Sequence, residues 1–170
     1  MSFKPYSKSK IKSIKKSFVK QSSIELEVLL LDIEDSINIG SIIRSADGMG
    51  LVHLNLSEIS MKYVGDLIAV TSMGLHRRID LKRVQNLEEF ILSFKDQGYQ
   101  IIGLDITENS VDYKTYSYPK KVLLIVGNEK IGIYKKYFKF IDTFVHIPMF
   151  GKGPSLNAAT AFAIVGFQII

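Results

Sequence analysis

The stretch that decides the fold of this chain is Ile147-Pro148-Met149-Phe150-Gly151-Lys152-Gly153-Pro154-Ser155-Leu156-Asn157. It begins in a predicted strand and passes through a loop with two glycines into the segment 158–170, which we expect to be a helix. That segment is apolar on almost every side, so we expect it to be buried on more than one face, in its own domain or against a partner subunit. Polar residues are scarce here. Ser155 and Asn157, which lie beside backbone that glycine makes adaptable, are therefore candidates for a functional role.

Composition limits the classes of protein to consider. The chain has 170 residues, 46% of them hydrophobic, and only four prolines, which favours one globular domain. It has no cysteine, so disulfides and thiolate metal sites are excluded. The three histidines, His53, His76 and His146, lack metal-ligand spacing, and we expect no metal. The longest apolar run is shorter than the roughly 20 residues of a membrane helix, and no signal peptide is visible. We therefore expect a cytoplasmic protein without a membrane segment.

The net charge of +5 is concentrated at one end of the chain. Residues 1–20 contain seven lysines and no acid, whereas the rest has 15 Lys and Arg against 17 Asp and Glu. We therefore predict a basic N-terminal extension, residues 1–22, followed by one domain, residues 23–170. The extension is typical of an arm that binds nucleic-acid phosphates. The alternatives are a solvated tail that keeps the protein soluble and a transit peptide, although transit peptides are normally richer in arginine.

The body of the chain alternates between strand-like and helix-like segments. The predicted strands are 25–33, 51–56, 78–84, 99–106, 122–126 and 144–149, and the predicted helices are 39–49, 66–73, 87–97, 130–141 and 158–170. Gly48 or Gly50 is expected to end the first of these helices, and the helix 130–141 is expected to have a basic outer face. This alternation predicts an α/β fold with a mostly parallel sheet and helices on both faces.

Ligands of such sheets bind beyond the carboxyl ends of the strands, and three loops there combine glycine with polar side chains. These loops are 38–44, 127–132 and 151–157. Glycine at such positions lets a ligand approach the main chain. The third loop lacks the spacing of a phosphate-binding P-loop, and Pro154 removes a donor amide, so we do not expect a P-loop.

The three loops resemble the motifs of one known family. Asn38-x-Gly40-x-x-x-Arg44-x-Ala46-x-x-x-Gly50 is similar to the first motif of the SpoU/TrmH methyltransferases of the SPOUT superfamily. Val126-Gly127-Asn128-Glu129-x-x-Gly132 resembles the second motif, and Ile147-Pro148-Met149-x-Gly151-x-x-x-Ser155-Leu156-Asn157-x-Ala159-x-Ala161 resembles the third. Thr71-Ser72-Met73-Gly74 is similar to a segment between the first two. The order and spacing agree from about residue 25 to 170, and the ordered set is much more specific than any one motif.

The resemblance implies a reaction and a fold. Family members transfer a methyl group from S-adenosylmethionine to a ribose 2′-hydroxyl of tRNA or rRNA, and tRNA is the more frequent substrate of compact relatives. Their C-terminal segment passes through a loop and forms a deep trefoil knot, which is otherwise very rare. They are homodimers with the active site near the subunit interface. No metal is required, because the methyl donor carries its own positive charge.

The resemblance also implies the site residues. The catalytic set carried over is Arg44, Asn38, Glu129, Ser155 and Asn157. Since a guanidinium keeps its proton, we expect Arg44 to bind the RNA phosphate next to the target ribose, and that phosphate could accept the proton. The cofactor-binding set consists of Leu104, Gly127, Asn128, Ile147, Met149 and Leu156. Many relatives have serine at Asn128, and we expect that position to act largely through its backbone.

Several alternatives remain open at this point. Arg44 could be an ordinary surface arginine, Glu129 could stabilise the dipole of a helix start, and Ser155 or Asn157 could be a plain helix cap. The whole protein could be a non-catalytic RNA-binding protein that keeps the fold. An unrelated nucleotide-binding α/β enzyme is the other alternative, and the missing dinucleotide fingerprint argues against it.

Overall fold

The computed structural model of the chain describes residues 4–17 and 23–170. The predicted basic extension includes residues 1–3 and 18–22, which lie outside the described residues. Its described part forms the helix α1, Lys8–Lys15, capped by the Ser7 hydroxyl, which accepts a hydrogen bond from the Lys10 amide at 3.3 Å. No residue of α1 is buried.

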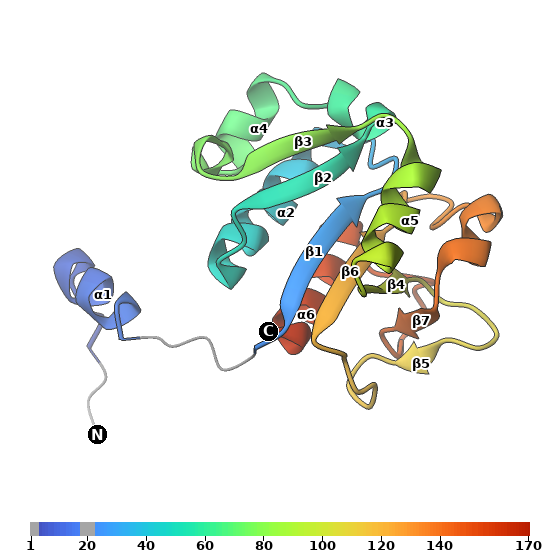
Figure 1. Cartoon of the computed structure of the whole chain (residues 1–170). Helices are drawn as coiled ribbons and strands as arrows, with labels where there is room; N and C mark the ends of the chain where they lie inside the picture. Colours follow the sequence, from blue (N-terminus) through green and yellow to red (C-terminus); the bar gives the residue numbers. More distant parts are fainter. Residues whose placement is uncertain (1–3, 18–22) are drawn as a thin grey trace.

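Within the described ranges, the strands form one seven-stranded sheet in the order β3-β2-β1-β6-β4-β7-β5, and every pairing is parallel (Figure 1). The strands are β1 Glu25–Leu30, β2 His53–Ser57, β3 Asp80–Val84, β4 Gln100–Leu104, β5 Val111–Asp112, β6 Lys121–Val126 and β7 Thr143–His146. Because the strands are parallel, their carboxyl ends lie at one edge of the sheet.

Helices cover both faces of the sheet, as predicted. Leu29 and Leu31 of the β1 segment belong to one apolar cluster with α5, Leu87–Asp96, and the 3₁₀ helix η2, Lys135–Phe140. Val28 and Leu30 belong to a second cluster with α2, Ser36–Met49, and α6, Ala158–Ile169. In Figure 1, α5 lies on the near side of the sheet and α2 and α6 lie behind it. Alternate residues of a fully buried strand thus serve two cores.

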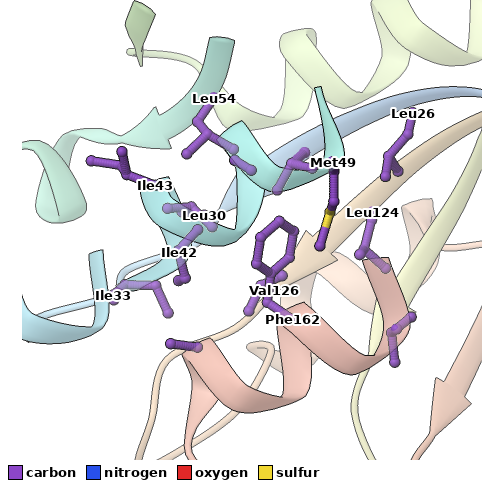
Figure 2. Close-up of a cluster of buried hydrophobic side chains, with 14 of the residues drawn as sticks. Leu26, Leu30, Ile33, Ile42, Ile43, Met49, Leu54, Leu124, Val126 and Phe162 are labelled. Carbon is purple, nitrogen blue, oxygen red and sulfur yellow. The ribbon is translucent and has the colours of Figure 1, made fainter. Parts of the chain in front are cut away.

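The α2–α6 layer is closely packed. Figure 2 shows Met49 of α2 beside Phe162 of α6, over the strand residue Val126. Small residues allow this proximity, since a Cβ built on Gly166 would lie 2.5 Å from the Met49 methyl carbon. On the exposed side of α6, Phe167 is 53% exposed. In this chain α6 is therefore buried along one face rather than on all sides.

The ends of α2 show how local sequence sets an element. The helix begins at Ser36, three residues before the start predicted at residue 39. Asp35 caps it by accepting a hydrogen bond from the Ile37 amide at 2.7 Å. Gly50 ends it in the left-handed region with φ of 77°. Gly40 lies inside the helix, and a Cβ there would lie 1.8 Å from the Thr71 hydroxyl. This glycine makes room for α4, Asp66–Thr71, rather than for a ligand.

The predicted helix over 130–141 is wrong. A tight turn occupies its start, where Gly132 has φ of 66°, and only the 3₁₀ helix η2 follows. Ile133 and Phe140 are both buried in the cluster that α5 and η2 share with Leu29 and Leu31. The two residues are seven positions apart, and an irregular segment with β-branched and aromatic residues can bury such a pair as well as a helix can. The expected basic outer face persists on η2, where Lys135, Lys136 and Lys139 are exposed.

Other differences concern element lengths. The predicted strand 144–149 ends at His146, because Pro148 has no amide to donate and the chain leaves the sheet there. The short helices α3, Glu58–Lys62, and η1, Leu75–Arg77, were not predicted, and neither was the two-residue strand β5. Such short elements depend on tertiary contacts rather than on a periodic pattern.

Candidate functional site

Three turns that are far apart in sequence meet at the carboxyl edge of the sheet. They follow β1, β6 and β7. Asn38 lies in the first turn of α2 after β1, Glu129 lies in the turn after β6, and Asn157 lies at the start of α6 after β7. The Asn38 amide nitrogen donates to a Glu129 carboxylate oxygen at 2.8 Å, and the Asn157 amide nitrogen donates to the Asn38 oxygen at 2.7 Å. We call this chain of hydrogen bonds the Asn38–Glu129–Asn157 network.

The carboxylate of Glu129 also organises the start of α2. Its two oxygens accept hydrogen bonds from the main-chain amides of Glu34 and Asp35, at 3.3 and 3.4 Å. A negative charge beside the first turn of a helix is favourable, because the helix dipole is positive there. The alternative interpretation placed Glu129 at the start of the helix predicted to follow it, whereas the structure places its carboxylate at the start of α2.

Asn157 is the N-cap of α6. Its side-chain oxygen accepts from the amides of Ala159 and Thr160 at 2.9 and 3.3 Å, while its nitrogen donates to Asn38. Both ends of the side-chain amide are therefore engaged, and the capping and network roles are combined in one residue. Ser155, the other predicted cap, is exposed and caps no described helix.

The turn after β6 is held by its own backbone. Asn128 and Gly132 exchange main-chain hydrogen bonds of 3.1 and 2.9 Å. A Cβ built on Gly127 would lie 2.4 Å from the carbonyl carbon of Gly132, so only glycine fits without moving the turn.

Asn128 does more in this turn than its backbone alone. Its buried side chain donates to the Asp32 carbonyl at 2.6 Å and accepts from the Lys130 amide at 2.9 Å. The expectation that this position acts largely through its backbone is therefore incomplete. The side chain ties the turn after β6 to the end of β1.

A cavity of about 340 Å³ lies between the turns after β4, β6 and β7. All six residues of the predicted cofactor set line it, and so does Ser155: Leu104, Gly127, Asn128, Ile147, Met149, Leu156 and Ser155. Its volume falls in the range of small-molecule sites. The charged residues on its wall are Asp105, Glu129 and Lys130. Apolar walls with a surplus of carboxylate suit a ligand that combines a flat apolar part with positive charge.

A second hollow of about 470 Å³ adjoins this cavity. Four residues line both, namely Glu129, Lys130, Leu156 and Ala158. Asn38, Asn157 and Tyr63 line only the second hollow. The Asn38–Glu129–Asn157 network thus forms part of the boundary between two neighbouring hollows, an arrangement that can hold two reactants side by side.

Arg44 is not brought to this network by its own chain. It follows Asn38 by six positions on α2, which places it about 9 Å further along the axis and roughly 120° around it. The side chain is exposed and makes no hydrogen bond or ion pair with the described residues. The surface around it includes Asp47, one turn further on, which pairs with Arg78 at 3.7 Å.

Two features were missed by sequence reasoning. Asp105 follows β4 at the same edge, lines the cavity, and accepts from the Ile133 amide at 2.9 Å. The rule that singled out the other polar turns after strands could have found it. Asp32, buried with φ of 58°, accepts a hydrogen bond from the Ser57 hydroxyl at 2.6 Å. No local pattern indicated that pair.

Among residues 4–17 and 23–170, no helix combines the length and apolar character that crossing a bilayer requires. The same residues contain no group of three or more His, Cys, Asp or Glu side chains placed to hold a metal ion.

Comparisons with known proteins point to one family. Residues 25–167 match the model of the SpoU rRNA Methylase family. A Staphylococcus saprophyticus protein assigned to the TrmH family of tRNA/rRNA methyltransferases is 33% identical over 143 residues, 84% of this chain and 57% of that protein. A tRNA (guanosine(18)-2′-O)-methyltransferase from Aquifex aeolicus is 28% identical over 144 residues, 85% of this chain and 68% of that enzyme.

A solved structure agrees with this. The SpoU methyltransferase AviRb from Streptomyces viridochromogenes, in complex with the cofactor AdoMet, superimposes with a TM-score of 0.77 at 26% identity, covering 88% of this chain and 60% of that one. This chain thus spans a little over half the length of some relatives it matches. The motifs, the topology and these similarities agree, and the chain belongs to the SpoU rRNA Methylase family.

Proposed function

We propose that this protein transfers a methyl group from S-adenosylmethionine to a ribose 2′-hydroxyl of RNA, with tRNA favoured over rRNA. The observation that carries the proposal is the meeting of three family motifs around two adjoining hollows, one apolar and one lined by the Asn38–Glu129–Asn157 network. The Aquifex aeolicus relative acts on a tRNA guanosine 2′-hydroxyl, which favours the same position and RNA class here.

The cavity of about 340 Å³ is the proposed cofactor site. S-adenosylmethionine, when bound, supplies a methyl group made electrophilic by a positively charged sulfur. Leu104, Ile147 and Leu156 offer apolar surface for its adenine, and main-chain groups near Gly127 and Met149 offer hydrogen bonds. The carboxylates of Asp105 and Glu129 favour a cationic ligand. AviRb binds the same cofactor.

The second hollow is the proposed position of the target ribose. Asn38 and Asn157 orient each other there, and Glu129 holds Asn38 through a charge-assisted hydrogen bond. Ser155, whose hydroxyl has no partner among the described residues, is free to contact the RNA at the rim of the cavity. These residues bring the 2′-oxygen into line with the methyl group, and such positioning lowers the barrier of a bimolecular reaction.

Arg44 is proposed to bind the phosphate next to that ribose, and the phosphate then accepts the proton from the 2′-hydroxyl. A guanidinium suits this task because it stays charged and presents a forked set of donors. On its own chain Arg44 points away from the network, so we propose that a homodimer brings it to the site of the second copy. The exposed apolar residues Leu67, Val70 and Met73 next to the α2 layer support an association between copies.

Three finer features belong to the same proposal. The C-terminal segment is threaded through an earlier loop as a trefoil knot, as in the family. Residues 1–22 form a basic extension that contacts RNA, and residues 23–170 form the methyltransferase domain, which acts in the cytoplasm. A crystal structure in which residues 147–170 pass outside every earlier loop would contradict the knot.

The test is transfer of tritiated methyl groups to RNA from cells that lack the protein, followed by mapping of 2′-O-methylated positions. One methylated ribose that appears only with the protein and cofactor is the expected result. RNA binding with no methyl transfer would instead favour a non-catalytic RNA-binding protein. A third measurement is the binding of S-adenosylmethionine and its displacement by S-adenosylhomocysteine. Such binding would exclude an unrelated nucleotide-binding enzyme.

A further inference from the structure

Phe150 is the most exposed large apolar side chain among the described residues, at 98%. It begins a run, residues 150–155, in which every residue is exposed. Gly151 and Gly153 have open space where a Cβ would be, with nothing within 4 Å, so no other part of the described chain covers these two positions. We call residues 150–155 the Phe150 loop.

The position of the loop relates it to the site. Met149 just before it and Ser155 at its end both line the cavity of about 340 Å³. Asn157, two residues later, belongs to the network at the second hollow. The loop therefore leaves the cavity wall, projects into solvent and returns to the same wall. An aromatic ring on such a loop stands beside the place where a reacting nucleotide is held.

We propose that Phe150 stacks on a base of the RNA next to the target nucleotide, while Lys152 binds a neighbouring phosphate. The inference rests on the proposed function and adds the residues that position the RNA. Unpaired bases stack on aromatic side chains irrespective of sequence, and a lysine two positions away suits the adjoining backbone. The loop thereby acts on single-stranded or unstacked RNA.

The composition of the loop favours RNA over a second copy of the chain as its contact. A protein interface buries a contiguous apolar centre with few charges. Here the ring is followed by Gly151, Lys152 and Gly153, so it is a single apolar group beside a positive charge. The exposed apolar residues Leu67, Val70 and Met73, by contrast, form a group of their own on and just after α4.

The test uses the full chain with three substitutions, Phe150→Ala, Phe150→Leu and Phe150→Trp, and RNA from cells lacking the protein as the probe. Stacking is worth about 1–3 kcal/mol per base, so Phe150→Ala should weaken RNA binding by about 5- to 150-fold. Phe150→Trp should retain binding within about threefold, since tryptophan stacks as well. Phe150→Leu keeps apolar character without a π-face and should resemble the alanine variant.

Three additional readouts keep the outcomes distinct. Cofactor affinity and oligomeric state should be unchanged in all three variants, and Val52→Ala, an exposed apolar residue at the opposite edge of the sheet, should bind RNA normally. Lys152→Ala should lower the slope of log affinity against log salt by about 0.7. Equal RNA binding by Phe150→Ala and the unchanged protein overturns the inference, as does dissociation of a dimer by that variant. If the unchanged protein transfers no methyl group to RNA, that result contradicts the proposed function and not the role of Phe150.

Discussion

Glu129 and Arg44 are both charged residues of the family motifs, but they differ in how many hydrogen bonds they make within the chain. Glu129 accepts three hydrogen bonds at the start of α2: two from the main-chain amides of Glu34 and Asp35, just before the helix, and one from the Asn38 side chain. Arg44, further along the same helix, has no hydrogen bond or ion pair with the described part of the chain. One charge is therefore bound within the folded chain, and the other is exposed without a partner among the described residues.

The difference has a thermodynamic meaning. A side chain that is held by several neighbours contributes both to stability and to the geometry of a site, so replacing it affects both. A side chain with no partner contributes little to stability, and its loss is felt only when the missing ligand is present. Stability and activity measured on the same variants can therefore separate the two groups.

The largest effect is expected for Arg44→Ala. We expect methyl transfer to RNA to fall by about 100- to 1000-fold, because a charged donor near the reacting oxygen is lost. Cofactor affinity and the midpoint of urea unfolding should stay unchanged. Arg44→Lys keeps the charge but loses the fork and should recover only a small part of the activity. Full turnover by Arg44→Ala would remove Arg44 from the mechanism.

The next effect is expected for Gly127→Ala. The added Cβ would lie 2.4 and 2.6 Å from the Gly132 carbonyl carbon and oxygen, so the turn that lines the cavity must move. If overpacking of about 1–3 kcal/mol falls on the bound state, S-adenosylmethionine affinity drops by about 5- to 150-fold, which calorimetry measures. Gly65→Ala is the matched control, since its Cβ meets nothing within 4 Å. Unchanged affinity in Gly127→Ala contradicts the assignment of the cavity.

Glu129→Gln sharpens the contrast with Arg44. It preserves size but removes the charge that accepts hydrogen bonds from Asn38 and from the start of α2. We expect the free energy of unfolding to fall by about 1–2 kcal/mol, with methyl transfer reduced about tenfold. Denaturant unfolding and the methyl-transfer assay measure the two effects. A variant of full stability would show that Glu129 resembles Arg44 after all.

Deletion of residues 1–22 should have the smallest effect. The described helix in this segment, α1, buries none of its residues, so stability should be preserved. RNA affinity should fall several-fold at low salt, and the salt slope should flatten by about 0.7 for each lysine that no longer contacts a phosphate. Replacing the lysines of α1 by glutamine is a matched control for charge alone. An identical salt slope means that the segment is a solubilising tail.

Much of the fold follows from local patterns. The apolar run Val28–Leu31 and the run from Val122 predicted the two central strands, because residues buried on both faces of a sheet are continuously apolar. The helix Leu87–Asp96 was predicted from its apolar stripe and the following Gly98. The helix predicted over 130–141 is wrong. The apolar residues of this segment pack on the sheet from a turn and a 3₁₀ helix, and their spacing in sequence does not distinguish that arrangement from an α-helix.

The sequence by itself determined the alternation of strands and helices, the polar turns after three strands and the scarcity of polar residues around Ser155 and Asn157. Only the tertiary structure decided which polar groups touch, that Arg44 faces away from them, and that Gly40 makes room for a helix whereas Gly127 makes room for a turn. Asn38 meets Glu129, 91 positions away, because β1 lies beside β6, and it meets Asn157, 119 positions away, because α2 packs in one layer with α6. Strand order is a property of the whole packed core, and no local period carries it.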